Sequence, residues 1–482
     1  MLYDENNPCS IEEYGKKMIG KTFREILEHP VCVEKFINDE SKFEYGKSHS
    51  RKGYKGGMGN LVEECYFGYK ANNNPNPDFA DAGVELKVTP YKNTSKGLRA
   101  KERLVISMID FFEIVNEDDF RHSHLWQKIH LILLVVYLHN KVKLDSTIDF
   151  VQLFTPPSED LKIIAADYNK IVNKIKAGKA HELSEGDTMY LGACTKASDS
   201  SVRRKQPFGN QDAKPRAFSL KQSYMTYVLN EYIVPGKTTY EPIIINGDKD
   251  FESYVVDKIN KYKGKTIQEL SCIFNLQKSK AKNIESMLVF RILGIKGNHA
   301  AQFEKAGIVV KTIRINNKGI IKEHMSFPII KYDELANETW DECSFGNYLR
   351  NTKFLFVVYR EDSKLQLHLE SCLFWNMPYC DIENNVQKVW QKMHDIVKLG
   401  KIHLEIDAKG TIHNNFPKAK DNKVCHVRPH ARNKMDVMPL PKGTKLNISG
   451  VNKDIWIYPD KFTKHCFWLD KKYILHQIAL CK

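Results

Sequence analysis

The residues most able to do chemistry lie in one short segment. Asp78, Glu85 and Lys87 bring two carboxylates and an ammonium group close together in the chain. Residues 84–88 alternate apolar and charged side chains, which predicts a half-buried strand with Glu85 and Lys87 on the same face. Asp78 follows the turn-forming residues 72–77, and a bend there would return its carboxylate toward Glu85.

This set of groups suits the hydrolysis of a phosphodiester. Two carboxylates and a backbone carbonyl can hold a hard divalent cation such as Mg²⁺, which polarises a phosphate and lowers the pKa of water. Lys87 would orient that water and stabilise the developing charge. The alternative is a solvated strand face, because Glu-x-Lys pairs are common; the glycine-rich basic stretch 52–59 upstream favours the metal site.

The elements that position these groups occur twice in the chain. Gly-Lys-Thr-x-x-Glu appears at Thr22–Glu25 and at Thr266–Glu269, and each predicts a helix that begins with a capping box. Phe79 to Lys87 (FADAGVELK) matches Phe303 to Lys311 (FEKAGIVVK) in the same order. Such repetition indicates a diverged duplication.

We therefore expect two tandem α/β domains, each a mixed sheet with flanking helices, at residues 1–236 and 249–482. The turn-rich residues 234–239 mark the boundary. Helices are expected at 10–29, 59–70, 162–177, 251–274 and 384–399, and strands at 83–90, 103–109, 307–316, 353–360 and 366–375. The apolar run 129–138 is too short to span a bilayer and predicts a buried helix or strand.

Alignment of the two copies predicts that the second one does not cut. Superposing Gly307 on Gly83 places Val309 opposite Glu85 and Gln302 opposite Asp78, and retains only the lysine, as Lys311. Without the carboxylates there is no metal and no activated water, so the second half should bind and not cleave.

The overall composition limits which classes of partner and cofactor the protein could bind. A net charge of +14 favours an anionic polymer, and 11 cysteines without a Cys-x-x-Cys pair indicate reduced thiols in a cytoplasm. No membrane segment is expected. Residues 15–22 fit a P-loop expression, but the residues before them are acidic and helical, so we expect no ATP. Cys425, His426 and His430 suggest zinc, yet no second cysteine pair completes the ligands, and we favour the interpretation without zinc.

The segment PDFADAGVELKVTP resembles the metal site of the MutH-like branch of the PD-(D/E)xK nucleases. In that branch a DNA-contacting lysine precedes a helical glutamate by eight residues, and Lys55 and Glu63 occupy those places, with Glu64 as a competitor. Taken over most of the chain, the resemblance is to Sau-type type II restriction endonucleases. It implies Mg²⁺, double-strand cleavage at GATC, and a catalytic set of Asp78, Glu85, Lys87 and Glu63, of which Asp78, Glu85 and Glu63 hold the metal.

DNA contacts are expected from basic residues in both halves. In the first half they are Lys55, Lys101, Lys196, Arg203, Arg204, Arg216 and Lys221, of which Lys101 could also flank the metal site. In the second half the loop CHVRPHAR resembles the family's DNA-contacting loop, and the candidates are Lys311, Arg428, His430 and Arg432.

Three functions follow from these residues. The favoured one is a restriction enzyme whose second half binds another double-stranded DNA copy as an allosteric effector, with two chains pairing on DNA to cut both strands. A second is a strand-nicking repair endonuclease, which would not need a duplicated half. A third is a noncatalytic DNA-binding regulator, which would not need intact Asp78, Glu85 and Lys87.

Overall fold

The computed structural model describes most of the chain, and its described residues form two compact units. The described ranges are 2–35, 57–70, 76–94, 97–197, 201–234, 240–245, 250–277, 281–341, 343–408, 410–433, 435–450 and 458–481. Unit 1 comprises Met1–Glu241 together with Ala301–Gly307, and unit 2 comprises Pro242–Ala300 and Ile308–Lys482. Helix α12 (Ala301–Ala306), which follows the expected domain boundary in the sequence, packs within unit 1 against helix α8 (Gln222–Val228).

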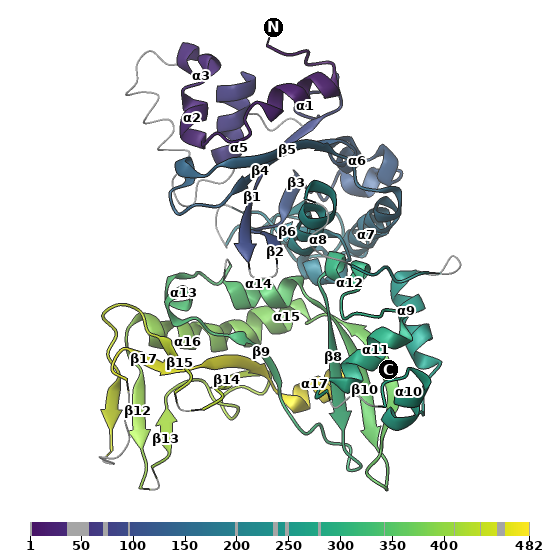
Figure 1. Cartoon of the computed structure of the whole chain (residues 1–482), viewed down its shortest axis with the longest axis vertical. Helices are drawn as coiled ribbons and strands as arrows, with labels where there is room; N and C mark the ends of the chain where they lie inside the picture. Colours follow the sequence, from purple (N-terminus) through teal and green to yellow (C-terminus); the bar gives the residue numbers. More distant parts are fainter. Residues whose placement is uncertain are drawn as a thin grey trace. The chain divides into compact units, whose positions relative to one another are not determined.

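A four-stranded sheet in the order β2-β1-β4-β5 forms the centre of unit 1 (Figure 1). Its strands are β1 (Glu85–Thr94), β2 (Gly97–Ala100), β4 (Ile132–Leu138) and β5 (Ile148–Phe154). Strand β4 carries the longest apolar run, and its first six residues are buried, which explains its central position. It pairs in parallel with β1 and antiparallel with β5. The alternation predicted around Glu85 thus forms a strand beside a fully buried one.

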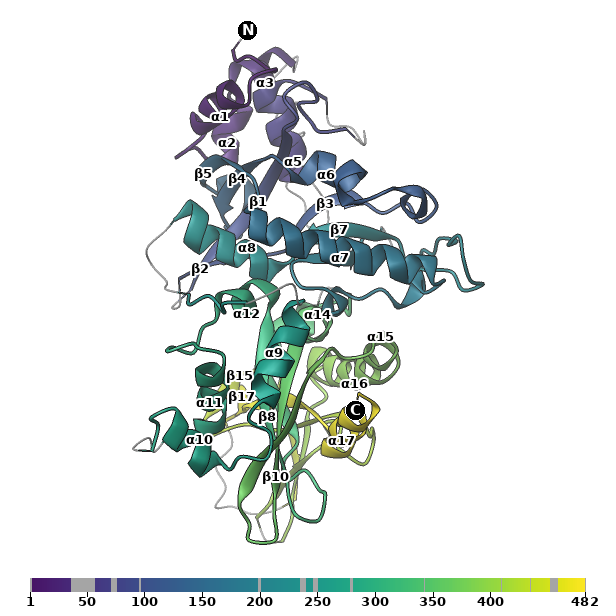
Figure 2. The same ribbon diagram turned by 90° about the vertical axis from the view of Figure 1, so that its right-hand side faces the viewer.

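A second, antiparallel sheet in unit 1 has the order β3-β7-β6. Helix α7 packs against β6 of this sheet, and α8 packs against β2 of the first sheet; both helices are drawn in Figure 2. The remaining elements of unit 1 are β3 (Leu104–Met108), β6 (Leu191–Thr195), β7 (Arg216–Leu220), α1 (Pro8–Lys16), α2 (Phe23–Leu27), α3 (Pro30–Lys35), α5 (Gly57–Val62), α6 (His124–Ile129), α7 (Ser158–Lys176), π-helices η1 (Glu63–Phe67) and η7 (Leu229–Ile233), and short 3₁₀ turns η2 (Ile114–Asn116), η3 (Phe120–His122), η4 (Lys143–Asp145), η5 (Ala180–Glu182) and η6 (Glu185–Asp187).

Unit 2 repeats the pairings of β1, β4 and β5 and those of the second sheet, and adds two small sheets, β13-β12-β16 and β15-β17. Strand β8 (Ile308–Ile315) pairs in parallel with β10 (Lys353–Glu361), which pairs antiparallel with β11 (Leu367–Trp375). The second sheet has the order β14-β18-β9, with antiparallel pairings as in β6-β7-β3. The other elements are β9 (Met325–Ile329), β12 (His403–Ile406), β13 (Ile412–Asn414), β14 (Cys425–Pro429), β15 (Val437–Pro439), β16 (Asn447–Ser449), β17 (Lys461–Thr463), β18 (His465–Leu469), α9 (Phe251–Asn260), α10 (Ile267–Ile273), α11 (Ile284–Ile292), α13 (Tyr332–Asn337), α14 (Ser344–Asn351), α15 (Tyr379–Asp381), η8 (Ile382–Val386), α16 (Gln387–Lys398) and α17 (Lys471–Leu480).

The Gly-Lys-Thr repeats adopt the same local structure in both units. Thr22 caps α2 and Thr266 caps α10, each with a complete capping box formed by the glutamate three residues later. The amide of Gly20 donates to the Ile148 carbonyl at 2.8 Å, and that of Gly264 donates to the Leu369 carbonyl at 2.8 Å. The motif therefore attaches the start of a helix to β5 in unit 1 and to β11 (Leu367–Trp375) in unit 2. The residues before the first copy form helix α1, where a P-loop would need a strand.

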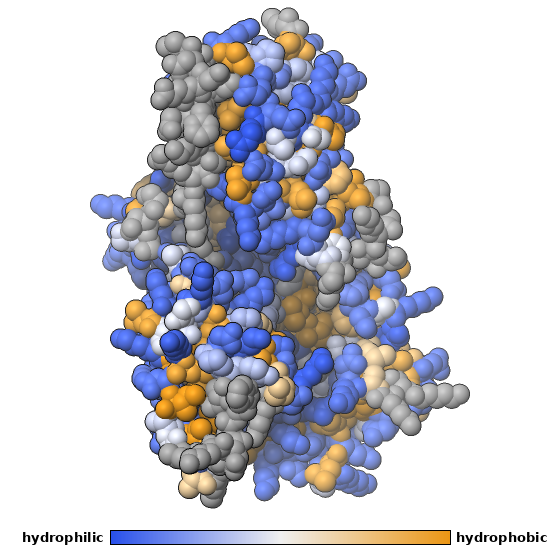
Figure 3. Space-filling view, turned by 60° about the vertical axis from the view of Figure 1, so that its left-hand side comes forward, coloured by the Kyte–Doolittle hydropathy of each residue, from blue (hydrophilic) through white to orange (hydrophobic). Residues whose placement is uncertain are grey.

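The described residues bury a large apolar cluster in each unit, and helices and strands both contribute to it. On the face drawn in Figure 3, hydrophilic residues predominate and hydrophobic ones lie in small separate groups. Across the parts of the chain that the structure describes, no helix has both the length and the apolar character needed to cross a membrane. For function, the important part of the fold is the end of the first sheet at which strand β1 begins.

Candidate active site

A tight hairpin before β1 brings Asp78 to the start of that strand. Phe79 and Val84 exchange two backbone hydrogen bonds, of 2.9 and 3.1 Å, and Gly83 closes the turn with a φ of +66° that a residue with a side chain rarely adopts. The Asp78 Oδ2 atom then accepts a hydrogen bond from the amide of Leu86 at 2.9 Å. The hairpin at residues 79–84 thus returns the carboxylate to β1, beside Glu85, while most of the predicted turn at 72–77 lies outside the described residues.

Two ammonium groups hold the Glu85 carboxylate. Glu85 is only 1% exposed. Lys87, two residues along the same strand face, forms an ion pair with Oε1, and the Nζ of Lys128 lies 3.2 and 3.1 Å from Oε1 and Oε2. A buried carboxylate needs such partners, because an unpaired charge in the interior costs several kcal/mol.

Sequence reasoning missed Lys128. It lies on α6, 43 residues from Glu85, in no recognisable motif. Only the strand register reveals it: Glu85 pairs with Ile132, four residues after Lys128, so the helix that precedes β4 ends beside the start of β1.

Glu63 completes an acidic group with Asp78 and Glu85. It is the first residue of η1, directly after α5. Burial, together with the Asp78 carboxylate, raises the pKa of Glu63 to about 7, and burial together with Glu85 raises the pKa of Asp78 to about 6. The three carboxyl groups form an all-oxygen donor set, which fits a hard divalent cation.

Tyr69 is a further side chain that the sequence analysis did not single out. Its ring packs edge-on against Phe79, with centroids 5.3 Å apart, and its buried hydroxyl has no hydrogen-bond partner within the described residues. Burial raises the pKa of Tyr69 well above its ordinary value, and the carboxylates of Asp78, Glu63 and Glu85 raise it further. The hydroxyl is therefore a neutral donor beside the acidic group.

The basic candidates of unit 1 lie in different environments. Lys55 falls outside the described residues. Lys101 donates its amide to Pro90, five residues beyond Glu85 on β1, which at about 3.3 Å per residue puts it about 17 Å from the carboxylates. The structure therefore does not bring Lys101 to the acidic group; it joins Lys92 and Lys143 near the other end of the strand.

The other basic candidates of unit 1 divide by exposure. Arg203 and Arg204 are exposed, and Lys196 is half-buried at the end of β6. Arg216, 3% exposed, donates to Ala193 and Thr195, and Lys221, 2% exposed, donates to the Thr188 carbonyl at 2.5 Å. The last two face the interior of the sheet, so a contact with DNA would require them to leave these partners.

In unit 2 the position equivalent to Glu85 holds Val309. Gly307 has a φ of +65°, matching Gly83, and Val309 is the second residue after it on a strand that again pairs in parallel with the next one. Gln302, which aligns with Asp78, lies in helix α12, whereas Asp78 directly precedes a hairpin. Lys311 is half-buried, with Nζ 3.5 Å from the Ser326 carbonyl. Neither carboxylate of the first copy has a counterpart here.

The segment CHVRPHAR, predicted as a loop, begins as strand β14 (Cys425–Pro429), and its basic side chains are open to solvent. Arg428, His430 and Arg432 are all exposed. The Arg428 guanidinium lies 5.8 Å from the centroid of the Trp468 ring, and the His430 ring lies 5.6 Å from the same ring. His430 and Arg432 also line a pocket with Asp436 and Lys464. These side chains have the exposure that DNA contacts require.

Comparisons with known proteins agree with the duplication. The family model for the DNA mismatch repair enzyme MutH matches at residues 67–167 and again at 293–387, so the two matched stretches contain Glu85 and Val309 respectively. MutH proteins of Shewanella baltica and Shewanella woodyi are each 26% identical to the chain, over 180 and 186 residues; the matches cover 37% and 36% of the chain and 79% and 76% of those proteins. One MutH thus corresponds to a minority of this chain.

A longer relative covers nearly the whole sequence. The type II restriction enzyme Sau3AI of Staphylococcus aureus is 34% identical over 475 residues, which span 91% of the chain and 95% of that enzyme. With two MutH regions in tandem and this extent of identity, the chain belongs to the family of MutH-like type II restriction endonucleases that includes Sau3AI, and it is a site-specific deoxyribonuclease.

Proposed function

We propose that the chain cleaves both strands of double-stranded DNA with Mg²⁺ at one active site, in unit 1, and that unit 2 binds a second DNA copy as an effector. The observation that carries this proposal is the gathering of Asp78, Glu85 and Lys87 at the start of β1, while Val309 stands at the equivalent place in unit 2. The recognition sequence we propose is GATC, as the resemblance to the Sau-type enzymes implies, and the place of action is the cytoplasm.

Each residue of the site has a defined task in this proposal. Asp78, Glu85 and Glu63 would hold the divalent ion. When bound there, the ion would supply positive charge that polarises the phosphate and makes water more acidic. Lys87, which contacts Glu85, would orient the attacking water and neutralise charge on the phosphate. Lys128 keeps the Glu85 carboxylate in place from the other side.

The effector role rests on different observations. Arg428, His430 and Arg432 are exposed on unit 2, and arginine forms bidentate hydrogen bonds with guanine in the major groove. In addition, the chain passes through unit 1 as helix α12 immediately before it enters β8, which carries Lys311. DNA bound at unit 2 therefore has a short covalent route to the catalytic unit. With one active site per chain, we propose that two chains pair on DNA to cut both strands.

A strand-nicking repair endonuclease is the second candidate, since the MutH family model matches a region in each half. The duplication and the match to 95% of a restriction enzyme favour the first proposal. A noncatalytic regulator is disfavoured by the intact acidic group.

The cleavage test uses supercoiled plasmid, Mg²⁺ and, in parallel, EDTA. We expect linear fragments with Mg²⁺ and intact plasmid with EDTA, and sequencing of the fragment ends gives the site and the cut position together. Open-circular product alone would support the nicking enzyme, and unchanged supercoiled plasmid at all protein concentrations would remove the nuclease proposal.

The effector test compares plasmids that carry one or two copies of the site. We expect faster cleavage with two copies, and stimulation of the one-site plasmid by a short duplex that contains the site. Equal rates without stimulation would show that unit 2 has no effector role, while leaving the cleavage proposal intact.

A further inference from the structure

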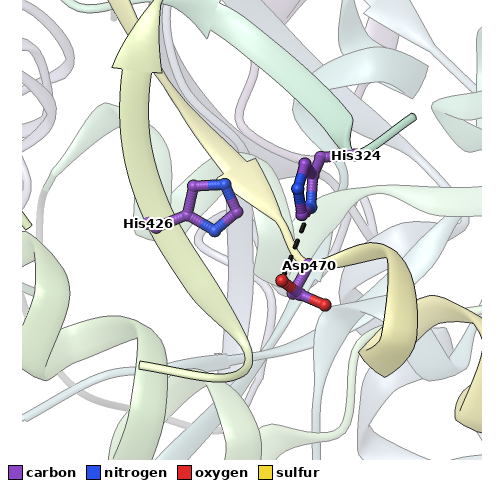
Figure 4. A group of neighbouring side chains, drawn as sticks. All are labelled: His324, His426 and Asp470. Atoms are coloured by element: carbon purple, nitrogen blue, oxygen red, sulfur yellow. Dashed lines mark ion pairs between the residues drawn. The ribbon is translucent and has the colours of Figure 1, made fainter. Parts of the chain in front are cut away.

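Three side chains of unit 2 converge at a place that the nuclease proposal does not use. They are His324, just before β9, His426 on β14, and Asp470, which precedes α17. One donor atom from each lies within 4.8 Å of the others. Figure 4 shows the two imidazole rings and the carboxylate facing a common space.

The burial of His426 distinguishes this cluster from an ordinary group of polar side chains. Its side chain is 0% exposed, and neither ring nitrogen has a hydrogen-bond partner within the described residues. Buried polar groups are normally paired, because an unpaired one costs about 1–3 kcal/mol. His426 faces the ring of His324 at 4.6 Å between centroids, so the unsatisfied imidazole points into the cluster. The described residues supply no partner for this imidazole, so a bound ligand would have to supply one.

The other two ligands have suitable geometry. The His324 Nδ1 and Asp470 Oδ2 atoms are 3.5 Å apart. That distance is long for a hydrogen bond, whereas two ligands on one tetrahedral ion, with bonds of about 2.0–2.1 Å, are separated by roughly 3.4 Å. The His324 Nδ1 atom accepts a hydrogen bond from the Lys471 amide at 3.1 Å, so this nitrogen is unprotonated. Coordination of a metal through Nδ1 would replace that hydrogen bond.

The charge state of the cluster also suits a metal. Burial lowers the pKa of His426 to about 4, and burial lowers the pKa of His324 as well, so both rings are neutral at physiological pH. Metal ions bind neutral imidazole. The Arg428 guanidinium, two residues beyond His426, opposes a cation, and the Asp470 carboxylate favours it.

The equivalent positions in unit 1 hold no such donors. Strand register aligns Leu104, Leu191 and Leu220 with Met325, Cys425 and Leu469. His324, His426 and Asp470 therefore correspond to Arg103, Gly192 and Lys221. In unit 1 an ion pair fills the space: Glu185 binds Arg103 and packs where a side chain on Gly192 would lie. Divergence of the second copy has replaced this ion pair with potential metal ligands.

We propose that His324, His426 and Asp470 bind one divalent transition-metal ion, for which Zn²⁺ is the appropriate probe. Two imidazoles and one carboxylate are ligands that Zn²⁺ accepts, and three protein ligands leave at least one position for water. The spacing of Cys425, His426 and His430 in the sequence favours an interpretation without zinc, because no second cysteine pair completes that set. Cys425 points into the apolar core on the opposite face of β14, and the partners of His426 come from distant parts of the chain.

The ion would fasten three segments of unit 2: the residues before β9, strand β14 and the start of α17. Arg428 lies on the same face of β14 as His426. This metal site does not depend on the proposed nuclease mechanism, since none of its three ligands belongs to the catalytic group.

The test is Zn²⁺ binding to the full-length chain, purified with EDTA and then freed of chelator. Titration against a chromophoric chelator, with Mg²⁺ in excess and in the Glu85→Gln background to suppress the acidic site, should show one Zn²⁺ per chain. Asp470→Asn and His324→Gln should weaken binding at least about tenfold to a hundredfold. Asn retains the helix cap that Asp470 provides to Lys472, so Asp470→Asn removes the charge without removing the cap.

His403→Gln serves as the matched control, because His403 is exposed and lies outside the cluster. Co²⁺ substitution gives an independent readout: we expect visible absorption of an imidazole- and carboxylate-ligated ion, lost in His426→Gln. No Zn²⁺ binding below millimolar concentrations, or binding that persists in both Asp470→Asn and His324→Gln, would overturn the proposal. A cobalt–thiolate band that these variants leave unchanged would likewise overturn it, by assigning the ion to cysteines.

Discussion

Binding of Mg²⁺ to unit 1 should release protons, and the number released should depend on pH. Glu63 and Asp78 have pKa values of about 7 and about 6, above their ordinary values of 4.5 and 3.8. Each difference corresponds to about 3 kcal/mol, at 1.36 kcal/mol for a tenfold change. Because the two carboxyls interact, their combined effect lies between about 3 and 6 kcal/mol.

The sign follows from the direction of the shifts. The folded chain binds these protons more tightly than the unfolded chain, so this contribution to stability is complete below about pH 4 and is lost as pH rises through 6 to 7. A divalent cation binds the ionised form and must displace the protons. Its apparent affinity should therefore be roughly a thousandfold weaker at pH 5 than at pH 8.

Isothermal titration calorimetry in buffers of different ionisation enthalpy measures this release. We expect about one proton or more per Mg²⁺ at pH 6 and almost none at pH 8.5. Glu64→Gln should leave the release unchanged, since Glu63 and not Glu64 is assigned to the site, whereas Asp78→Asn should reduce it. Binding without proton release at pH 6 would refute the reasoning, because the carboxyls would then already be ionised.

Three further predictions concern single residues. Lys128→Met should lower the free energy of unfolding by about 3 kcal/mol in urea, because the buried Glu85 carboxylate loses one of its two cations; a change below about 1 kcal/mol would contradict that role. Tyr69→Phe should leave the unfolding midpoint unchanged, since its hydroxyl has no partner among the described residues, and should slow cleavage about tenfold if the hydroxyl orders the site; unchanged cleavage would contradict the second part. Thr22→Ala and Thr266→Ala should each cost about 1 kcal/mol through loss of a helix cap, and unequal effects in thermal unfolding would show that the two capping boxes differ in role.

Local patterns predicted much of the fold, because its main signals are short in range. The capping boxes at Thr22 and Thr266 depend on four consecutive residues, and both are present. The alternation around Glu85 predicted a half-buried strand, and β1 begins there, but Glu85 is buried together with Leu86, so the charged face is not solvated at its start. The run 129–138 left helix and strand open, since a segment buried on both faces shows no periodicity; it is the central strand β4.

Contacts between distant residues could not be predicted in the same way. Lys128 reaches Glu85 only through the register of β1 and β4. Arg216 and Lys221 read as surface cations, yet both side chains lie inside and donate to backbone carbonyls. His324 and Asp470 are 146 residues apart, and only the pairing of β9 and β14 with β18 brings them to His426.

In the proposed mechanism, carboxylates of unit 1 bind a metal ion, and unit 2 lacks the carboxylates that would bind one. The most direct measurement is single-turnover cleavage with saturating Mg²⁺ by two variants at equivalent positions, Glu85→Gln and Val309→Thr, with DNA binding measured alongside. The account predicts that Glu85→Gln loses cleavage by roughly a thousandfold while it still binds DNA, and that Val309→Thr cleaves at the unmodified rate. Retained cleavage in Glu85→Gln, or its loss in a folded Val309→Thr, would contradict it.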